Sequence, residues 1–328
     1  MIIKTVKNLV AFVILFASSA AYAVTIQIVS TDGPGEGLNS SQSVPAVAGN
    51  DGRTLGQQYM NVLRAAADFY QTRLVSDVEI RIEVGFDPLE CDDSSGQLGG
   101  AGPLNAFINF ENAPNQGTAY VSALANSLAG RDLDPADNDV SSVFNSRLNG
   151  DEACLRGLTW WLGIGAPAPA RTVSLYDTAL HEIAHGLGFL TFVDEDGARI
   201  TTATGRPFND PFMLNLFDVV QDRPWSQMDD AQRSASSLNN GSLVWRGGAV
   251  DQGAGVFTGG RNGNGQLRIY APRVFDEGSS VSHWDTAVGP DELMEPFSTA
   301  TSNSCATLLA LRDMGWRTQN ECAAAPSE

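Results

Sequence analysis

Lysine is almost absent from this chain of 328 residues. Both lysines lie within the first seven residues, and 20 lysine and arginine residues stand against 38 aspartate and glutamate residues, which gives a formal net charge of −18. Because nucleic acids and anionic membranes attract proteins through basic patches, neither is an expected partner. The acidic excess is instead typical of a highly soluble surface.

Cysteine is also scarce, and no two cysteines form a C-x-x-C pair. This absence argues against a cysteine zinc site and against thioredoxin-like redox chemistry. The four cysteines are an even number, which in an exported chain predicts two disulfides, although four cysteines allow more than one pairing. We favour Cys91–Cys154 and Cys305–Cys322, the second of which would clamp the final helix to the tail.

No long apolar run follows the one at the start of the chain. Leu9 to Phe16 is almost wholly apolar, two lysines precede it, and Ala21-Tyr22-Ala23 has the small-x-small pattern of a cleavage site. These features predict a signal peptide over residues 1–23, a mature chain that starts near Val24, and secretion to the periplasm or the extracellular space. A membrane anchor is the alternative, but the run falls short of the roughly 20 residues that span a bilayer. We therefore expect no membrane span.

The rest of the chain mixes the period-two pattern of strands with the 3.6-residue pattern of helices. Strands are expected at residues 25–29, 78–86, 106–110 and 140–148, and helices at residues 55–74, 172–189, 228–236 and 305–314. The polar surroundings of residues 140–148 favour an edge strand. Residues 192–280 are rich in glycine, asparagine and aspartate and predict loops with a single helix. The order predicts an α+β fold, with a mixed-sheet upper lobe (about 24–190), a loop-rich lower lobe (about 191–322) and a tail (323–328).

One short motif carries chemistry, and it lies in the expected helix 172–189. The motif is His181-Glu182-Ile183-Ala184-His185, and the spacing of Ser174 and Asp177 before it is typical of a helix cap. Residues four apart share one face of a helix, so His181 and His185 can bind the same zinc ion. Glu182 is the neighbouring carboxylate that can take a proton from a water on that metal.

The third metal ligand must come from elsewhere, because a catalytic zinc site has three protein ligands and one open position. The short pattern H-E-x-x-H-x-x-G-x-x-H would place it at Thr191, which is a poor zinc donor. His283 is the single remaining histidine, and economy favours it. A glutamate from a later segment, Glu292 or Glu295, is the competing donor.

Three segments together resemble leishmanolysin, the metzincin-clan peptidase in which a long insertion delays the third histidine. They are the motif helix, Ser282-His283-Trp284 and Glu292-Leu293-Met294. The resemblance covers residues 172–193 and 278–298 well and the rest weakly. It implies a metzincin-like catalytic domain over residues 24–322 with a zinc cleft between its lobes. It also implies that His181, His185 and His283 bind the metal, that Glu182 is the base, and that Met294 lies in the turn beneath the metal.

The expected activity is therefore that of a zinc endopeptidase acting on protein or peptide substrates. A secreted adhesin or binding protein that keeps the fold is the first alternative, and a zinc hydrolase of non-peptide substrates is the second. The intact Glu182 argues against the adhesin, because a purely structural zinc site needs no base. The sequence indicates neither the physiological substrate nor the oligomeric state.

Two further features are weaker candidates. Asp285 lies two residues beyond His283 and could orient a ligating histidine. Asp194-Glu195-Asp196-Gly197 could bind a structural Ca²⁺, but it lacks the pattern of an EF-hand loop, and a hairpin turn is the simpler interpretation.

Overall fold

The computed structural model describes residues 23–299, 301, 303–319, 321 and 322. The predicted signal peptide up to residue 22 and the predicted tail at residues 323–328 lie outside the described residues. None of the helices in the described part of the chain combines the length and the apolar character that crossing a bilayer requires.

The described residues form a mixed α+β fold, as the sequence predicts. Its helices are α1 (Leu55–Gln71), α2 (Ser122–Ala129), α3 (Leu175–Gly186), α4 (Asp230–Ser236), α5 (Gly248–Gly253) and α6 (Cys305–Met314). Its strands are β1 (Ile26–Ser30), β2 (Leu74–Val75), β3 (Ile80–Asp87), β4 (Gly99–Pro103), β5 (Ala106–Ile108), β6 (Ala119–Val121), β7 (Val140–Asn145), β8 (Thr159–Trp161), β9 (Thr172–Ser174), β10 (Leu216–Asp218), β11 (Arg223–Pro224), β12 (Leu243–Trp245) and β13 (Arg317–Thr318).

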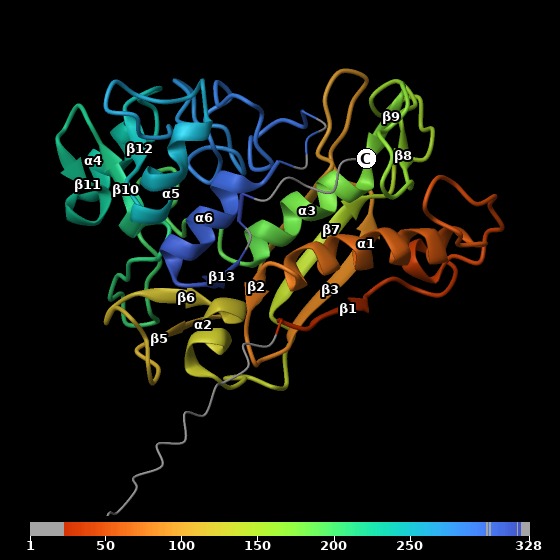
Figure 1. The fold of residues 1–328 in the computed structure, drawn as a ribbon, viewed down its shortest axis with the longest axis horizontal. Coiled ribbons are helices and arrows are strands. Elements are labelled where there is room, and N and C mark those ends of the chain that lie inside the picture. Colours follow the sequence, from red (N-terminus) through yellow and green to blue (C-terminus); the bar gives the residue numbers. More distant parts are fainter. Residues whose placement is uncertain (1–22, 300, 302, 320, 323–328) are drawn as a thin grey trace, which may run out of the picture.

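The central sheet has four strands in the order β1-β3-β7-β4. The first three run parallel, and β4 runs antiparallel to β7. Residues Ile80 to Val84 of β3 alternate between buried and half-buried, because the pleat turns successive side chains to opposite faces. The buried face is covered by α1 and α3, which lie side by side on it (Figure 1).

The strand expected at residues 140–148 takes a different place in the sheet. Its polar residues suggested an edge strand, which is wrong, because β7 pairs with β3 on one side and β4 on the other. Val140 and Phe144 are buried, and so is Ser142 between them. The strand at this edge is β4, whose Gly-Gly-Ala-Gly-Pro sequence has none of the β-branched or aromatic residues that mark a strand.

Helix α1 begins at a capping box. Thr54 Oγ1 accepts a hydrogen bond from Gln57 N at 3.2 Å, and the Gln57 side chain accepts one from Thr54 N. Near the other end of the helix, the Tyr70 hydroxyl donates to Leu180 O at 2.7 Å. This buried bond fixes α1 against the helix that carries the histidine motif.

Helix α3 is shorter than predicted at both ends. It starts at Leu175 because residues 172–174 form β9 and pair with β8. Ser174 Oγ accepts from Asp177 N at 3.1 Å, which confirms Ser174 as the cap. A Cβ on Gly186 would come within 2.3 Å of Val140 Cγ1, so the glycine is what allows α3 to lie directly on β7.

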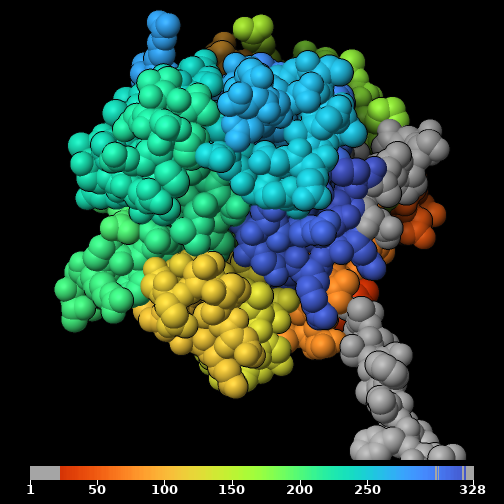
Figure 2. Space-filling model, turned by 60° about the vertical axis from the view of Figure 1, so that its left-hand side comes forward, coloured from red at the N-terminus to blue at the C-terminus, as the bar shows by residue number. Residues whose placement is uncertain are grey.

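The carboxy-terminal half, residues 191–322, is built mostly from short elements. Three of its strands form a small sheet in the order β11-β10-β12. The expectation of one helix between residues 192 and 280 is wrong, because α5 follows α4. Helix α5 has six residues, too few to show helical periodicity in the sequence. Figure 2 shows this half as one continuous body, with the yellow segment that contains β5, β6 and α2 below it.

An aromatic cluster joins the two halves behind the motif helix. Phe189, just past the end of α3, packs edge-on against Phe212 and Trp284, with ring centroids 5.1 and 5.3 Å away. Trp245 packs on both of these rings, at 4.9 and 5.7 Å. Such edge-to-face contacts add to the free energy of apolar burial.

Both predicted disulfides are confirmed. Cys91 is bonded to Cys154, and Cys305 is bonded to Cys322. The first joins the loop before β4 to the loop before β8, and the second ties the start of α6 to the chain beyond β13.

Candidate metal centre

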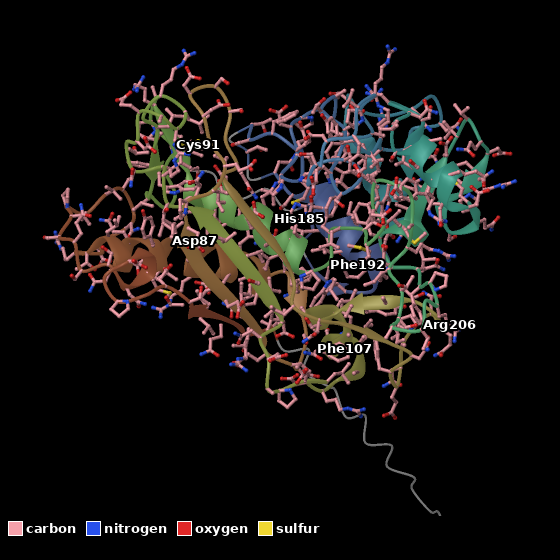
Figure 3. All side chains as sticks on the ribbon, turned by 180° about the vertical axis from the view of Figure 1, so that it is seen from behind. Asp87, Cys91, Phe107, His185, Phe192 and Arg206 are labelled. Carbon is pink, nitrogen blue, oxygen red and sulfur yellow. A yellow bond between two sulfur atoms is a disulfide. The ribbon has the colours of Figure 1, made fainter. Side chains whose placement is uncertain are left out.

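Three histidines from distant parts of the chain meet at the carboxy-terminal half of α3. His181 Nε2 lies 3.0 Å from His283 Nε2, and His185 Nε2 lies 3.2 Å from the same atom. Among the described residues, these three form the one group of His, Cys, Asp or Glu side chains close enough to hold a metal ion. Figure 3 places His185 where α3 meets the carboxy-terminal half.

The opposite nitrogen of each ring is bound to a backbone carbonyl. His181 Nδ1 lies 2.8 Å from Leu293 O, His185 Nδ1 2.8 Å from Phe189 O, and His283 Nδ1 2.8 Å from Ser279 O. A carbonyl oxygen only accepts, so each Nδ1 must donate its proton. Each neutral ring then presents a bare Nε2 lone pair to the other two. Three converging lone pairs repel one another unless a cation lies between them.

Burial keeps these rings neutral. It lowers the pKa of His181 to about 4 and that of His185 to about 3, and it lowers the pKa of His283 well below 6.5. A histidine must be unprotonated to bind a metal. The folded chain therefore presents three unprotonated histidines that lie close enough to hold a metal ion at neutral pH.

Glu182 lies next to the histidines and faces the edge of the sheet. Its side chain is buried, and burial raises its pKa to about 8. Among the described residues it has no hydrogen-bond partner. A Cβ on Gly99 of β4 would lie 3.1 Å from both Glu182 Cγ and Glu182 Oε1. A divalent cation beside this carboxylate would stabilise its charged form.

The segment around Met294 is hydrogen-bonded to His181 and to the segment that contains His283. Leu293 O accepts from His181, and Met294 O accepts from Trp284 N at 2.8 Å, one residue after His283. Met294 itself is fully buried. The segment is in turn held by Glu292, whose carboxylate accepts from Thr307 N and Thr307 Oγ1 in the first turn of α6.

The structure leaves the competing third ligands outside the group. Glu292 is engaged at α6, and Glu295 Oε1 accepts from Glu292 N at 2.8 Å. Thr191 donates its hydroxyl to Asp210 Oδ2 at 2.8 Å. Of the candidates named from the sequence, His283 is the one that lies with His181 and His185.

The suggestion that Asp285 orients a ligating histidine has to be corrected, because its carboxylate binds other groups. Its Oδ1 accepts from Ala287 N at 2.8 Å and from Arg268 Nη2 at 3.4 Å. The Nδ1 of His283 is bound instead by Ser279 O. Backbone carbonyls orient all three rings, and sequence reasoning could not find them, because a carbonyl leaves no signal in the residue type.

The loop at residues 194–197 is a turn. Asp194 Oδ1 accepts from Ala198 N at 2.8 Å, and Gly197 N donates to Asp194 O at 2.9 Å. The carbonyl oxygens of Glu195 and Gly197 are bound by Ser234 and Arg233 of α4. The carboxylates of this loop do not gather into a group of three or more metal donors among the described residues.

Comparisons with models of protein families, with curated proteins and with solved structures find no match for this chain.

Proposed function

We propose that this protein is a secreted zinc-dependent endopeptidase in which His181, His185 and His283 hold one Zn²⁺ and Glu182 is the general base. One observation carries the proposal: three Nε2 lone pairs converge, and the carboxylate of Glu182, the residue next to His181, is buried and has no hydrogen-bond partner among the described residues. Three histidines with an open fourth position are a common ligand set of catalytic zinc.

The spacing of the nitrogens supports zinc. Tetrahedral coordination at a Zn–N distance of about 2.0–2.1 Å separates two ligand nitrogens by about 3.3 Å. The two closest pairs are 3.0 and 3.2 Å apart. The resemblance to leishmanolysin in the motif helix and around Met294 supports the same metal and the same metzincin-like arrangement of two lobes around a zinc cleft.

The chain's own residues have distinct roles in the proposed reaction. The three histidines bind and orient the metal through Nε2, with the rings held by carbonyls. Zinc, when bound, lowers the pKa of its water to about 7 and polarises the scissile carbonyl. Glu182 accepts the proton of the attacking water and returns it to the leaving amine.

The sheet edge beside Glu182 supports a peptide as the substrate. Asn145 N donates to Leu98 O at 2.9 Å, so Gly99, the next residue of β4, turns its N–H and C=O away from β7. Among the described strands, β4 has no second neighbour. An extended peptide can add to such an edge through backbone hydrogen bonds. The addition would bring its carbonyls alongside Glu182.

The test is the substitution Glu182→Gln in the mature chain. It removes the proton acceptor and keeps the ligands, so we expect cleavage of a diverse peptide library to fall by at least about 10²–10⁴-fold. Zinc content measured by elemental analysis should stay unchanged. Glu83→Gln, at a half-buried glutamate on the opposite face of the sheet, is the control and should cut at the wild-type rate.

Three outcomes separate the candidate functions. Cleavage by the Glu182→Gln variant at the wild-type rate would sink the mechanism. A wild-type protein that binds zinc but cuts no peptide would favour the adhesin or a hydrolase of other substrates. Activity that a chelator removes and added zinc restores would support the proposal.

A further inference from the structure

Two segments that carry metal ligands approach each other beyond the end of α3. His185 is 98 residues before His283, yet their Nε2 atoms lie 3.2 Å apart. The first segment leaves the helix at Phe189, whose carbonyl orients His185. The second is the loop that holds Ser282 and His283. A side-chain link between the two segments would determine how well the third ligand is placed.

A buried carboxylate anchors the first segment. Asp210 Oδ2 accepts from Thr191 Oγ1 at 2.8 Å and from Phe192 N at 3.0 Å, and Asp210 Oδ1 accepts from Met213 N at 2.7 Å. The side chain of Asp210 is 2% exposed. Burying a carboxylate is costly unless donors surround it. These three donors therefore fix residues 191 and 192 against the chain at residues 210–213.

The same threonine binds the second segment through its backbone. Thr191 N donates to Ser282 Oγ at 3.2 Å. Ser282 is the residue before His283, and its own N–H is held by Ser280 O at 2.9 Å. The link therefore runs from the buried carboxylate through Thr191 to the residue beside the third ligand.

We infer that Asp210, Thr191 and Ser282 form a brace that holds the His283 loop on the end of α3, and that Asp210 and Ser282 are positioning residues of the metal site. The inference rests on the proposed metal site. Metal–ligand distances tolerate deviations of only about 0.2 Å, so a small shift of the His283 loop weakens the site. The brace also gives Thr191 a purpose in the position where the short metzincin spacing places a ligand.

The chain offers a matched control for each variant. Asp218 is fully buried and accepts one hydroxyl and two backbone N–H groups, from Ser236, Val220 and Gln221, so it matches Asp210 in burial and in donors. Ser280 lies in the same loop as Ser282, and its Oγ accepts from Asp276 N at 2.9 Å. Neither control side chain takes part in the link between Thr191 and the His283 loop.

The experiment measures zinc affinity by competition with a chromogenic chelator, on the mature chain without substrate. We expect Asp210→Asn and Ser282→Ala to bind zinc at least about tenfold more weakly than wild type, the usual cost of removing an outer partner of a metal ligand. Asp218→Asn and Ser280→Ala should stay within about twofold of wild type, even where thermal unfolding shows a loss of stability. Ser282→Thr keeps the hydroxyl and should restore affinity.

The outcomes are decisive even if one variant fails to fold. Ser282→Ala removes a half-buried hydroxyl, so it tests the brace if Asp210→Asn is insoluble. Wild-type affinity in Ser282→Ala, or an equal loss in Asp218→Asn and Asp210→Asn, would overturn the inference. A protein that binds zinc with the expected variant pattern but cuts no peptide would retain the brace and reject the peptidase. A wild-type chain that binds no zinc would overturn both.

Discussion

The two halves of the molecule differ in the length of their regular secondary structure. In the amino-terminal half, residues 24–190, the longest regular elements are a four-stranded sheet and helices of 17 and 12 residues. Before α6, the longest helix of the carboxy-terminal half has seven residues. Four buried charged side chains bind backbone groups there, at Asp210, Asp218, Arg233 and Glu292.

This difference gives the two halves different roles at the proposed metal site. His181, Glu182 and His185 are placed by the periodicity of one helix that rests on the sheet. His283 comes from a loop whose position depends on side-chain bonds and on the aromatic cluster. We therefore expect the amino-terminal half to place the base and two of the proposed ligands, and the carboxy-terminal half to place the third.

The largest effect is expected at the third ligand. His283→Ala removes one of three ligands, and because zinc-peptide sites bind with roughly 10–16 kcal/mol in all, the loss should be roughly 4 kcal/mol, or about a thousandfold in affinity. Thr191→Ala removes a hydroxyl but keeps the backbone N–H that binds Ser282, so its zinc affinity should fall less than about tenfold.

Metal analysis after dialysis distinguishes the two variants. Stoichiometric zinc in His283→Ala, or loss of zinc in Thr191→Ala alone, would contradict this assignment of the ligands. His185→Ala provides the helix-borne comparison and should lose zinc as fully as His283→Ala.

Removing one disulfide should cost more stability, and removing the other should cost more metal retention. The Cys91–Cys154 bond closes 63 residues and the Cys305–Cys322 bond closes 17. On chain-entropy grounds, replacing each pair with serine should cost about 4 and about 3 kcal/mol of unfolding free energy, respectively. Urea unfolding of the two double variants measures this ranking.

The effect on the rate of zinc release should be larger for the disulfide whose loss costs less stability. Cys305 starts α6, whose Thr307 binds Glu292, and Glu292 holds the segment that orients His181. Loss of the Cys305–Cys322 bond should therefore speed zinc release, whereas loss of the Cys91–Cys154 bond should not. Equal release rates in the two double variants would show that α6 needs no covalent tie to support the metal site.

The sequence predicts best those elements, in either half, whose own residues carry a helix cap or a helical periodicity. Helix α3 follows from its cap at Ser174 and from the four-residue spacing of His181 and His185. The final helix, residues 305–314, is confirmed residue for residue. Each of these elements is specified by side chains within the element itself.

What could not be predicted depends on distant partners. Strand β4 is a strand because β7 offers a backbone edge, and its own glycines carry no strand preference. His283 could be named because histidine is rare here, but the Asp210 brace joins residues 191, 210 and 282, which no local pattern relates. The error at β7 likewise concerns non-local pairing, with β3 and β4, whereas α5 is too short to show helical periodicity.

A smaller effect tests how far the carboxy-terminal half depends on its buried carboxylates. Burial raises the pKa of Asp210 from 3.8 to about 6. Between these values the folded chain keeps a proton that the unfolded chain has lost. The stability contributed by this group is therefore complete below about pH 4 and is lost as the pH rises through about 6. Two pKa units correspond to about 3 kcal/mol.

Asp210→Asn does not titrate at this position, so it isolates the effect. The unfolding free energy of the metal-free wild type, minus that of Asp210→Asn, should fall by up to about 3 kcal/mol between pH 4 and pH 7. Urea unfolding at several pH values measures the difference. A difference that rises with pH would mean that the hydrogen bonds to the carboxylate outweigh its burial.

The smallest effect concerns how the sheet edge places the base. A Cβ on Gly99 would lie 3.1 Å from Glu182 Cγ, Glu182 Oε1 and Val143 O, closer than nine in ten ordinary contacts of a Cβ. A Cβ on Gly102 of the same strand would meet nothing within 4 Å. Gly99→Ala should therefore push the Glu182 carboxylate aside and lower kcat about tenfold, because small misplacements of a catalytic group are costly. Zinc affinity should not change, since the histidines do not contact this strand through their ring nitrogens. Gly102→Ala should keep kcat within about twofold. If both alanine variants behave alike, or if Gly99→Ala loses zinc, then the edge of the sheet does not act through Glu182. The proposal that the amino-terminal half positions the base through β4 would then be wrong.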